Sequence, residues 1–131
     1  MKTGGCDPRS GVRAFLIGLG LLVPAGLTAC HSSHIDMAVQ NRTGEPIRLL
    51  EVDYPSASFG SDALADGASF HYRIQVQGNG RLKVLYTSAE GRQIQIDGPS
   101  LAERQEGTVE IELLPAGRAE FHPHLSGPSA P

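Results

Sequence analysis

The sequence predicts an all-β protein: a small antiparallel β-sandwich of about seven or eight strands, after an N-terminal signal helix. Three observations favour this class. Short segments alternate apolar and polar residues with a period of two, turn-forming residues separate them every 8–12 residues or so, and no helical apolar period follows Cys30. An immunoglobulin-like and a transthyretin-like sandwich both fit, and a small barrel is the alternative.

The first two strands are expected at Ile35–Gln40 and Ile47–Tyr54, joined by a turn over residues 41–46. Every second residue from Ile35 to Val39 is apolar, which places one face of this strand in the core. In the second strand the doublet Leu49-Leu50 interrupts the alternation. This doublet predicts a β-bulge or a strand covered on both faces.

Pro55 is expected to end the second strand, and the segment Tyr54–Asp62 to form a loop of small residues around one aromatic side chain. Tyr54 and Phe59 make this loop a candidate binding surface. Phe59 is better explained, however, as a plug over the end of the core than as a ligand platform. The clearest alternation follows over Ser69–Gln77, which is typical of an antiparallel strand with one face in water.

A hairpin is predicted at Gly78-Asn79-Gly80, because adjacent positions there can adopt positive φ. A later strand over Gln93–Asp97 is expected to end at Gly98-Pro99-Ser100. The side chains expected to face the core in the strands after residue 80 include Leu82, Val84, Tyr86, Val109, Ile111 and Leu113.

The last part of the sandwich is expected to begin with a polar crossover over residues 101–107. After the next strand, Pro115-Ala116-Gly117 turns the chain into a short last strand around Ala119 and Phe121. The segment Leu125–Pro131 is rich in Gly, Ser and Pro, and is expected to be a disordered tail.

Residues 1–29 have the features of a secretory signal peptide. Lys2, Arg9 and Arg13 supply positive charge, and the apolar run Ala14–Val23 that follows carries none. This run is shorter than the ~20 residues that a membrane-spanning helix needs. A break at Pro24-Ala25-Gly26 then precedes the small residues of a cleavage site.

The sequence Leu27-Thr28-Ala29-Cys30 resembles the lipobox of bacterial lipoproteins, in which an apolar residue and two small residues precede a cysteine. The resemblance implies cleavage between Ala29 and Cys30, a diacylglyceryl group on the Cys30 thiol, and acylation of the new amino group with a fatty acid such as palmitate. No cofactor is expected besides this covalent lipid. Residues 41–59 and the later Gly/Asn turns are also similar to small bacterial lipoproteins, a resemblance that implies no particular activity. An ordinary secretory signal followed by a chance cysteine is the alternative.

The resemblance implies four regions: a cleaved signal peptide (1–29), a lipidated cysteine with a short tether (30–34), the β-sandwich (35–124) and a tail (125–131). At roughly 3.5 Å per extended residue, the tether would hold the domain close to the lipid surface. An aspartate after the lipidated cysteine is the family's signal for the inner membrane, and His31 stands there instead. In a Gram-negative cell we therefore expect the periplasmic face of the outer membrane.

The charge of the chain does not suit nucleic acid. The net charge is −3, and three of the eleven basic residues lie in the predicted signal peptide, so the remaining domain is more acidic still. The expected partners are the membrane, through the lipid, and a protein of the cell envelope. The oligomeric state is left open.

Three histidines give an alternative function, that of a periplasmic metal-binding lipoprotein. The segment His122-Pro123-His124 presents two imidazoles, and His34 would approach them if the first and last strands were neighbours. Three imidazoles can hold zinc or copper. Solvated surface histidines explain the same residues more simply.

Two pairs of acids share strand faces, Glu51 with Asp53 and Glu110 with Glu112. They could serve acid–base hydrolysis if two carboxylates met across a cleft about 5–10 Å wide. Alternation explains them more simply as water-facing positions. The chain also contains no nucleophile-elbow, P-loop or zinc-protease motif. We therefore expect a lipid-anchored envelope protein that is a binding or structural module and not an enzyme.

Overall fold

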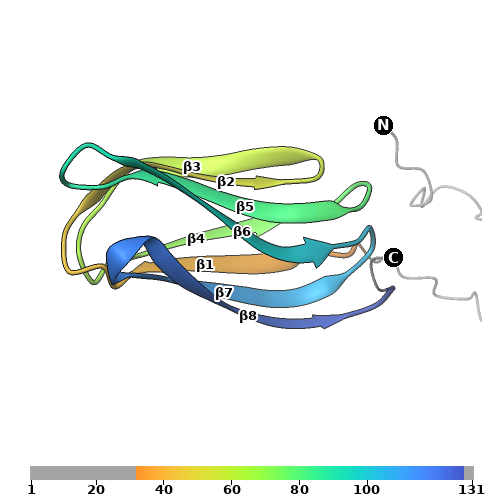
Figure 1. Ribbon diagram of the computed structural model, residues 1–131. Helices are drawn as coiled ribbons and strands as arrows, with labels where there is room; N and C mark the ends of the chain where they lie inside the picture. Colours follow the sequence, from red (N-terminus) through yellow and green to blue (C-terminus); the bar gives the residue numbers. More distant parts are fainter. Residues whose placement is uncertain (1–31, 129–131) are drawn as a thin grey trace, which may run out of the picture. The chain divides into compact units, whose positions relative to one another are not determined.

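The computed structural model describes residues 32–128 of the chain (Figure 1). Among these residues, no helix has the length and apolar character needed to cross a bilayer. The secondary-structure elements in chain order are β1 (Ile35–Asn41), β2 (Ile47–Tyr54), β3 (Ala57–Leu64), β4 (Ser69–Ile74), β5 (Gly80–Thr87), β6 (Gln93–Leu101), β7 (Glu106–Leu114), the 3-10 turn η1 (Pro115–Gly117) and β8 (Arg118–Ser126).

The eight strands form two four-stranded sheets that pack as a sandwich (Figure 1). The β1 sheet has the order β4-β1-β7-β8, and the β2 sheet has the order β3-β2-β5-β6. All neighbouring strands are antiparallel except β1 and β7, which are parallel, with Ile35 opposite Gly107. The predicted β-sandwich is confirmed, apart from this one parallel pair.

The strand order distinguishes between the two sandwich types that the sequence left open. In the immunoglobulin type, the first, second, fourth and fifth strands share one sheet and the third, sixth and seventh share the other. Here β1 and β2 lie in different sheets. The arrangement therefore departs from the immunoglobulin type and leaves the transthyretin-like alternative.

Apolar side chains at alternating positions fill the space between the two sheets. Burying each of the larger ones contributes about 1.5–3 kcal/mol, so this layer is the main source of stability. The core positions expected from the alternation are confirmed. Buried members of the core include Ile35, Met37, Val39, Ile47, Leu50, Val52, Leu82, Val84, Tyr86, Val109, Ile111 and Leu113.

The predicted β-bulge is present at Leu49-Leu50. The pairing of β2 with β5 changes register between Arg48 and Glu51, and Leu49 adopts a left-handed backbone conformation with φ of 51°. As a result Leu49 is 62% exposed, whereas Leu50 is only 2% exposed. The extra residue moves the inward positions of β2 from odd to even numbers, which lets both ends of the strand contribute to the core.

The expectation that Tyr54–Asp62 forms a loop is wrong. The chain reverses at Pro55-Ser56, and β3 pairs antiparallel with β2 from Ala57 onward. The small residues that suggested a loop have a packing role in the strand. A Cβ atom on Gly60 would collide with the backbone carbonyl oxygen of Leu50, so the strand can pass the bulge only with glycine at this position.

The predicted hairpin at Gly78-Asn79-Gly80 is also wrong. β4 pairs with β1, whereas β5 pairs with β2 and β6, so residues 75–79 carry the chain from one sheet to the other. Gly78 does adopt positive φ, of 86°. The turn residues thus fix the local backbone, but they do not determine which strands pair.

The strands β6 and β8 are longer than expected. β6 continues through Gly98-Pro99-Ser100 to Leu101, because it is an edge strand and an edge strand tolerates the missing N–H of Pro99. β8 continues to Ser126, so Leu125 and Ser126 belong to the sandwich and not to a tail. Residues 129–131 lie outside the described residues.

A buried asparagine holds the end of the sandwich where β1 finishes. Asn41 is 0% exposed, and its Nδ2 donates hydrogen bonds to the carbonyl oxygens of Glu45 (2.9 Å) and Leu64 (3.0 Å). Its Oδ1 accepts a hydrogen bond from the backbone N–H of Thr43 at 3.0 Å. One side chain therefore joins the β1–β2 turn to the end of β3.

Candidate functional site

The outer face of the β1 sheet carries polar side chains at the positions that alternate with the core. In the β7–β8 pair, Glu112 lies opposite Glu120, and Glu110 lies opposite His122. Side chains directly opposite each other across such a pair have Cβ atoms about 4.5–5.5 Å apart. The pairing register therefore gathers three carboxylates and an imidazole in two adjacent rows.

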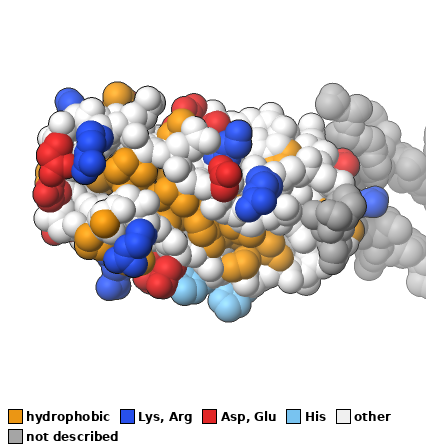
Figure 2. Space-filling view, in the orientation of Figure 1, with side chains coloured by type: hydrophobic (Ala, Val, Ile, Leu, Met, Phe, Trp, Pro, Cys, Tyr) orange, Lys and Arg blue, Asp and Glu red, His pale blue; other side chains and the backbone are white. Residues whose placement is uncertain are grey.

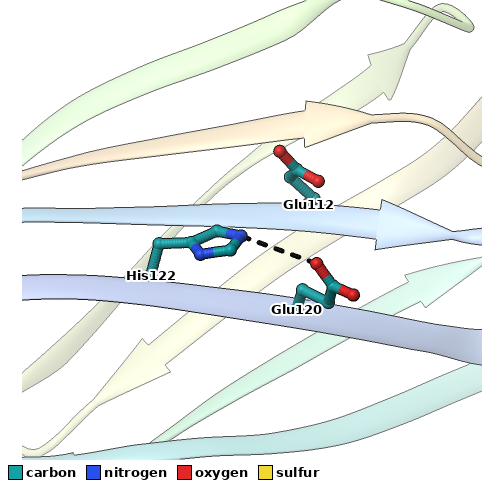
Figure 3. A group of neighbouring side chains, drawn as sticks. All are labelled: Glu112, Glu120 and His122. Carbon is teal, nitrogen blue, oxygen red and sulfur yellow. Dashed lines mark ion pairs between the residues drawn. The ribbon is translucent and has the colours of Figure 1, made fainter.

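Three of these side chains converge (Figure 3). One potential ligand atom from each of Glu112, Glu120 and His122 lies within 4.8 Å of the other two. The Nε2 atom of His122 is 3.7 Å from the Oε1 atom of Glu120, and the two side chains are 43% and 60% exposed. Within residues 32–128, this is the one group of three or more potential metal ligands that lies so close together.

The structure does not bring together the three histidines that the sequence singled out. β7 lies between β1 and β8, so the first and last strands are not neighbours. His34 precedes β1, where its carbonyl oxygen accepts a hydrogen bond from the N–H of Gly107. His124 lies opposite Thr108, beyond the converging group. Only His122 belongs to a potential metal site.

The sequence positions of Glu112 and Glu120 relative to the turn indicate that they meet, although the alternation of residue types does not. Alternation identifies Glu112 as a water-facing acid, but it gives no reason to distinguish Glu120 from other polar residues of the last strand. In an antiparallel pair that turns around Ala116, residues at equal distances from the turn face each other. Glu112 and Glu120 are such a pair. The register of the hairpin, once known, identifies the group.

The two pairs of acids cannot form a joint catalytic site. Glu51 and Asp53 lie on the outer face of the β2 sheet, on either side of the fully buried Val52. Glu110 and Glu112 flank the fully buried Ile111 and lie on the outer face of the β1 sheet. Because the core separates these two faces, the pairs point away from each other, and both are water-facing as expected.

Two aspartates on the outer faces have shifted pKa values. Partial burial raises the pKa of Asp53 above its ordinary value, and the neighbouring charge of Glu51 adds to this effect while Lys83 opposes it. The pKa of Asp36 is lowered by a hydrogen bond from Arg73, whose Nε lies 2.8 Å from Asp36 Oδ1. The shift of Asp53 thus comes mainly from burial, whereas that of Asp36 comes mainly from a neighbouring side chain on the same face of the sheet.

The candidate binding residues Tyr54 and Phe59 belong to an aromatic cluster inside the sandwich edge. Phe59 is 7% exposed, and its ring stacks on the ring of Tyr72 with centroids 4.7 Å apart. Phe70 lies 6.0 Å and Tyr54 lies 6.3 Å from Phe59. Phe59 is therefore part of the core, as the plug interpretation expected, and it is not an exposed contact residue.

A shallow pocket of about 180 Å³ lies among the turns at the end of the sandwich where β1 finishes. Its walls include Thr43, Tyr86 and Gly117, and an ion pair between Arg92 and Glu90 at 3.5 Å. The pocket is smaller than the 300–1,000 Å³ or so of typical small-molecule sites. Its size suits a small group of a larger partner better than a whole ligand.

Apolar side chains are also exposed along one seam between the sheets. Figure 2 shows a band of hydrophobic side chains that follows the seam between the edge strands β6 and β8. β6 pairs only with β5, and β8 pairs only with β7, so each has one edge without a neighbouring strand among the described residues. The half-buried residues of these two strands that pack on the core are Ile94, Ile96, Ala119, Phe121 and Leu125.

The proposed lipidation and cleavage residues, Cys30 and Ala29, lie outside the described residues, as do the signal peptide and His31. Their role stays a prediction from the sequence.

The fold defines this chain as a small β-sandwich protein of eight strands. A solved structure with a similar fold is described as "NMR structure of the protein from Eubacterium rectale". The two align with a TM-score of 0.51 over 69% of this chain and 87% of that chain, at 14% sequence identity, so the likeness concerns the fold alone. No protein-family model matches the chain, and no curated protein matches its sequence.

Proposed function

We propose that this protein is a lipid-anchored β-sandwich of the bacterial cell envelope that acts by binding a partner and not by catalysis. The observation that carries the proposal is the lipobox-like sequence Leu27–Cys30, which follows the apolar run Ala14–Val23 after the short break at residues 24–26. Two or three acyl chains on Cys30 would hold the protein firmly, since each buried methylene contributes about 0.8 kcal/mol.

The position of β1 supports a close anchor. Only residues 31–34 separate Cys30 from the start of β1, and at roughly 3.5 Å per extended residue they reach about 14 Å. Ile35 pairs with Gly107 at the start of β7, and Glu106 pairs with Ser126 at the end of β8. The end of the sandwich that carries these residues would therefore face the membrane.

Two features would then remain accessible to a partner. The turns around Thr43, Arg92 and Gly117 lie at the opposite end and would point away from the membrane, with the small pocket between them. The apolar seam between β6 and β8 runs along the side of the sandwich (Figure 2). Exposed apolar bands and unpaired strand edges are typical of protein contact surfaces. We therefore place the protein partner on this seam.

The anchor is tested by the intact mass of the full chain expressed in a bacterial host. We expect a mature chain that starts at Cys30 and carries the added mass of a diacylglyceryl and an acyl group. The variant Cys30→Ala should lack this lipid mass, whereas the matched variant Cys6→Ala, within the predicted signal peptide, should give the same mature protein as the wild type. An unlipidated chain, or one with an intact N-terminus, would overturn the proposal.

The partner surface is tested by a photo-crosslinking residue placed at Ile94 in the seam, with the same residue at Glu51 as the matched control. Glu51 is exposed on the outer face of the β2 sheet, away from the seam. In cells of the native bacterium, a discrete crosslinked species from position 94 that is absent from position 51 is expected. Equal crosslinking from both positions, or none from position 94, would contradict the seam as the contact surface.

A further inference from the structure

We propose that Glu112, Glu120 and His122 form a binding site for a divalent transition-metal ion, with Zn²⁺ as the best-fitting member of that class. The site offers one imidazole nitrogen and two carboxylate oxygens, all within 4.8 Å of one another (Figure 3). Zinc binds such atoms at about 2.0–2.2 Å, so its ligand atoms lie about 3.3 Å apart in a tetrahedron. Small rotations of these partly exposed side chains are enough to bring the ligand atoms from their present separations of up to 4.8 Å to the ~3.3 Å of a zinc site.

The backbone that carries the three side chains is a regularly paired antiparallel strand pair. Glu112 and Glu120 are direct partners in the β7–β8 pair, and His122 follows Glu120 on the same face of β8. The pairing is continuous from the partners Leu114 and Arg118 beside the turn to the partners Glu106 and Ser126 at the other end. Ligands on such strands are held more accurately than ligands on loops, so little backbone rearrangement is needed on binding.

The negative charges of the carboxylates favour binding of a cation at this site. Carboxylates directly opposite each other across a sheet destabilise the pair, and Glu110 adds a third carboxylate in the next row. Among residues 32–128, no lysine or arginine forms an ion pair with Glu112 or Glu120, and His122 is the only ion-pair partner of Glu120. A bound dication would neutralise the opposed carboxylates.

The ligand set selects the class of metal. Calcium and magnesium prefer sites made of oxygen atoms, whereas imidazole nitrogen favours zinc, copper and nickel. Three protein ligands leave one tetrahedral position of zinc open to water or to a group of another molecule.

The test is calorimetric titration of the full chain with ZnCl₂ in metal-free buffer. All proteins carry Cys6→Ser and Cys30→Ser, which removes thiolate ligands and the lipid and so separates this test from that of the anchor. We expect one Zn²⁺ per chain. His122→Ala and Glu120→Gln should each weaken binding at least tenfold, whereas His124→Ala, which removes the next histidine on the same strand and face, should leave it unchanged.

Thermal denaturation with and without Zn²⁺ gives a second readout that also shows whether each variant folds. A rise in the melting temperature is expected for the parent protein and for His124→Ala, and not for His122→Ala. The proposal is overturned if Zn²⁺ does not bind at millimolar concentration, if His122→Ala binds it as well as the parent, or if His124→Ala weakens binding equally.

Discussion

The rings of Phe59 and Tyr72 stack across an edge of the sandwich, with centroids 4.7 Å apart and planes inclined by 16°. Phe59 lies on β3 in one sheet, and Tyr72 lies on β4 in the other. No hydrogen-bond ladder joins these two strands, so the aromatic contact connects the sheets at this edge. The exposed fraction is 7% for Phe59 and 48% for Tyr72, so Phe59 contributes more to the core.

Phe59→Ala is expected to lower the free energy of unfolding by about 3–4 kcal/mol, because it leaves a cavity among Tyr54, Phe70 and Tyr72. Tyr72→Ala should lower the free energy of unfolding by less, since about half of the Tyr72 surface is already exposed to water. Urea denaturation of both variants and of the double variant gives the coupling between the rings, expected at about 0.5–1.5 kcal/mol. Equal losses for the two single variants would contradict this assignment.

Gly60→Ala is expected to lower the free energy of unfolding by at least about 2 kcal/mol, because the added methyl group collides with the backbone at Leu50. A backbone atom cannot rotate away as a side chain can. Ser58→Ala is the matched control on the same strand, where only an exposed hydrogen bond to Glu51 is lost, and it should change stability by less than about 0.5 kcal/mol. Chemical denaturation measures both, and a tolerated Gly60→Ala would show that the bulge can open.

Asn41→Ala is expected to lower the free energy of unfolding by about 2–3 kcal/mol, because it removes the hydrogen bonds that Asn41 donates to the Glu45 and Leu64 carbonyl groups and accepts from the Thr43 N–H. The neighbouring variant Gln40→Ala removes a hydrogen bond with Arg42 that is exposed, and should have an effect below about 0.5 kcal/mol. Thermal and urea denaturation of the two variants provide the comparison. Similar effects for both would show that the buried network contributes little.

Asp53→Asn is expected to raise stability at neutral pH. The pKa of Asp53 is raised in the folded protein, so its ionised form is disfavoured there, and stability falls as the pH rises through the interval between the unfolded and folded pKa values. The variant removes this cost at pH 7, and its advantage should vanish at about pH 3, where the aspartate is neutral in both states. Denaturation midpoints at the two pH values test this.

Asp97→Asn is the matched control for this prediction, because Asp97 lies opposite Lys83 in the same row and is exposed. The Asp97→Asn variant should show no comparable gain in stability at pH 7. A gain for Asp53→Asn that persists at pH 3 would mean that the effect does not come from ionisation.

The sequence by itself determined which residues form the core and where one strand is irregular. Alternation with a period of two reports which face of a strand is buried, so Ile35, Val84 and Ile111 could be placed inside before any pairing was known. The doublet Leu49-Leu50 revealed the bulge for the same reason, since two adjacent apolar residues cannot both point inward from a regular strand.

The tertiary structure alone decided which strands are neighbours. Turn residues such as Gly78 fix the local backbone, but the choice between a hairpin and a crossing to the other sheet depends on how distant strands pack on the core. The parallel pairing of β1 with β7 and the meeting of Glu112, Glu120 and His122 follow from that choice and from the β7–β8 register. The energy of strand pairing comes from contacts between residues far apart in the chain. Local patterns of residue type therefore do not predict which strands pair.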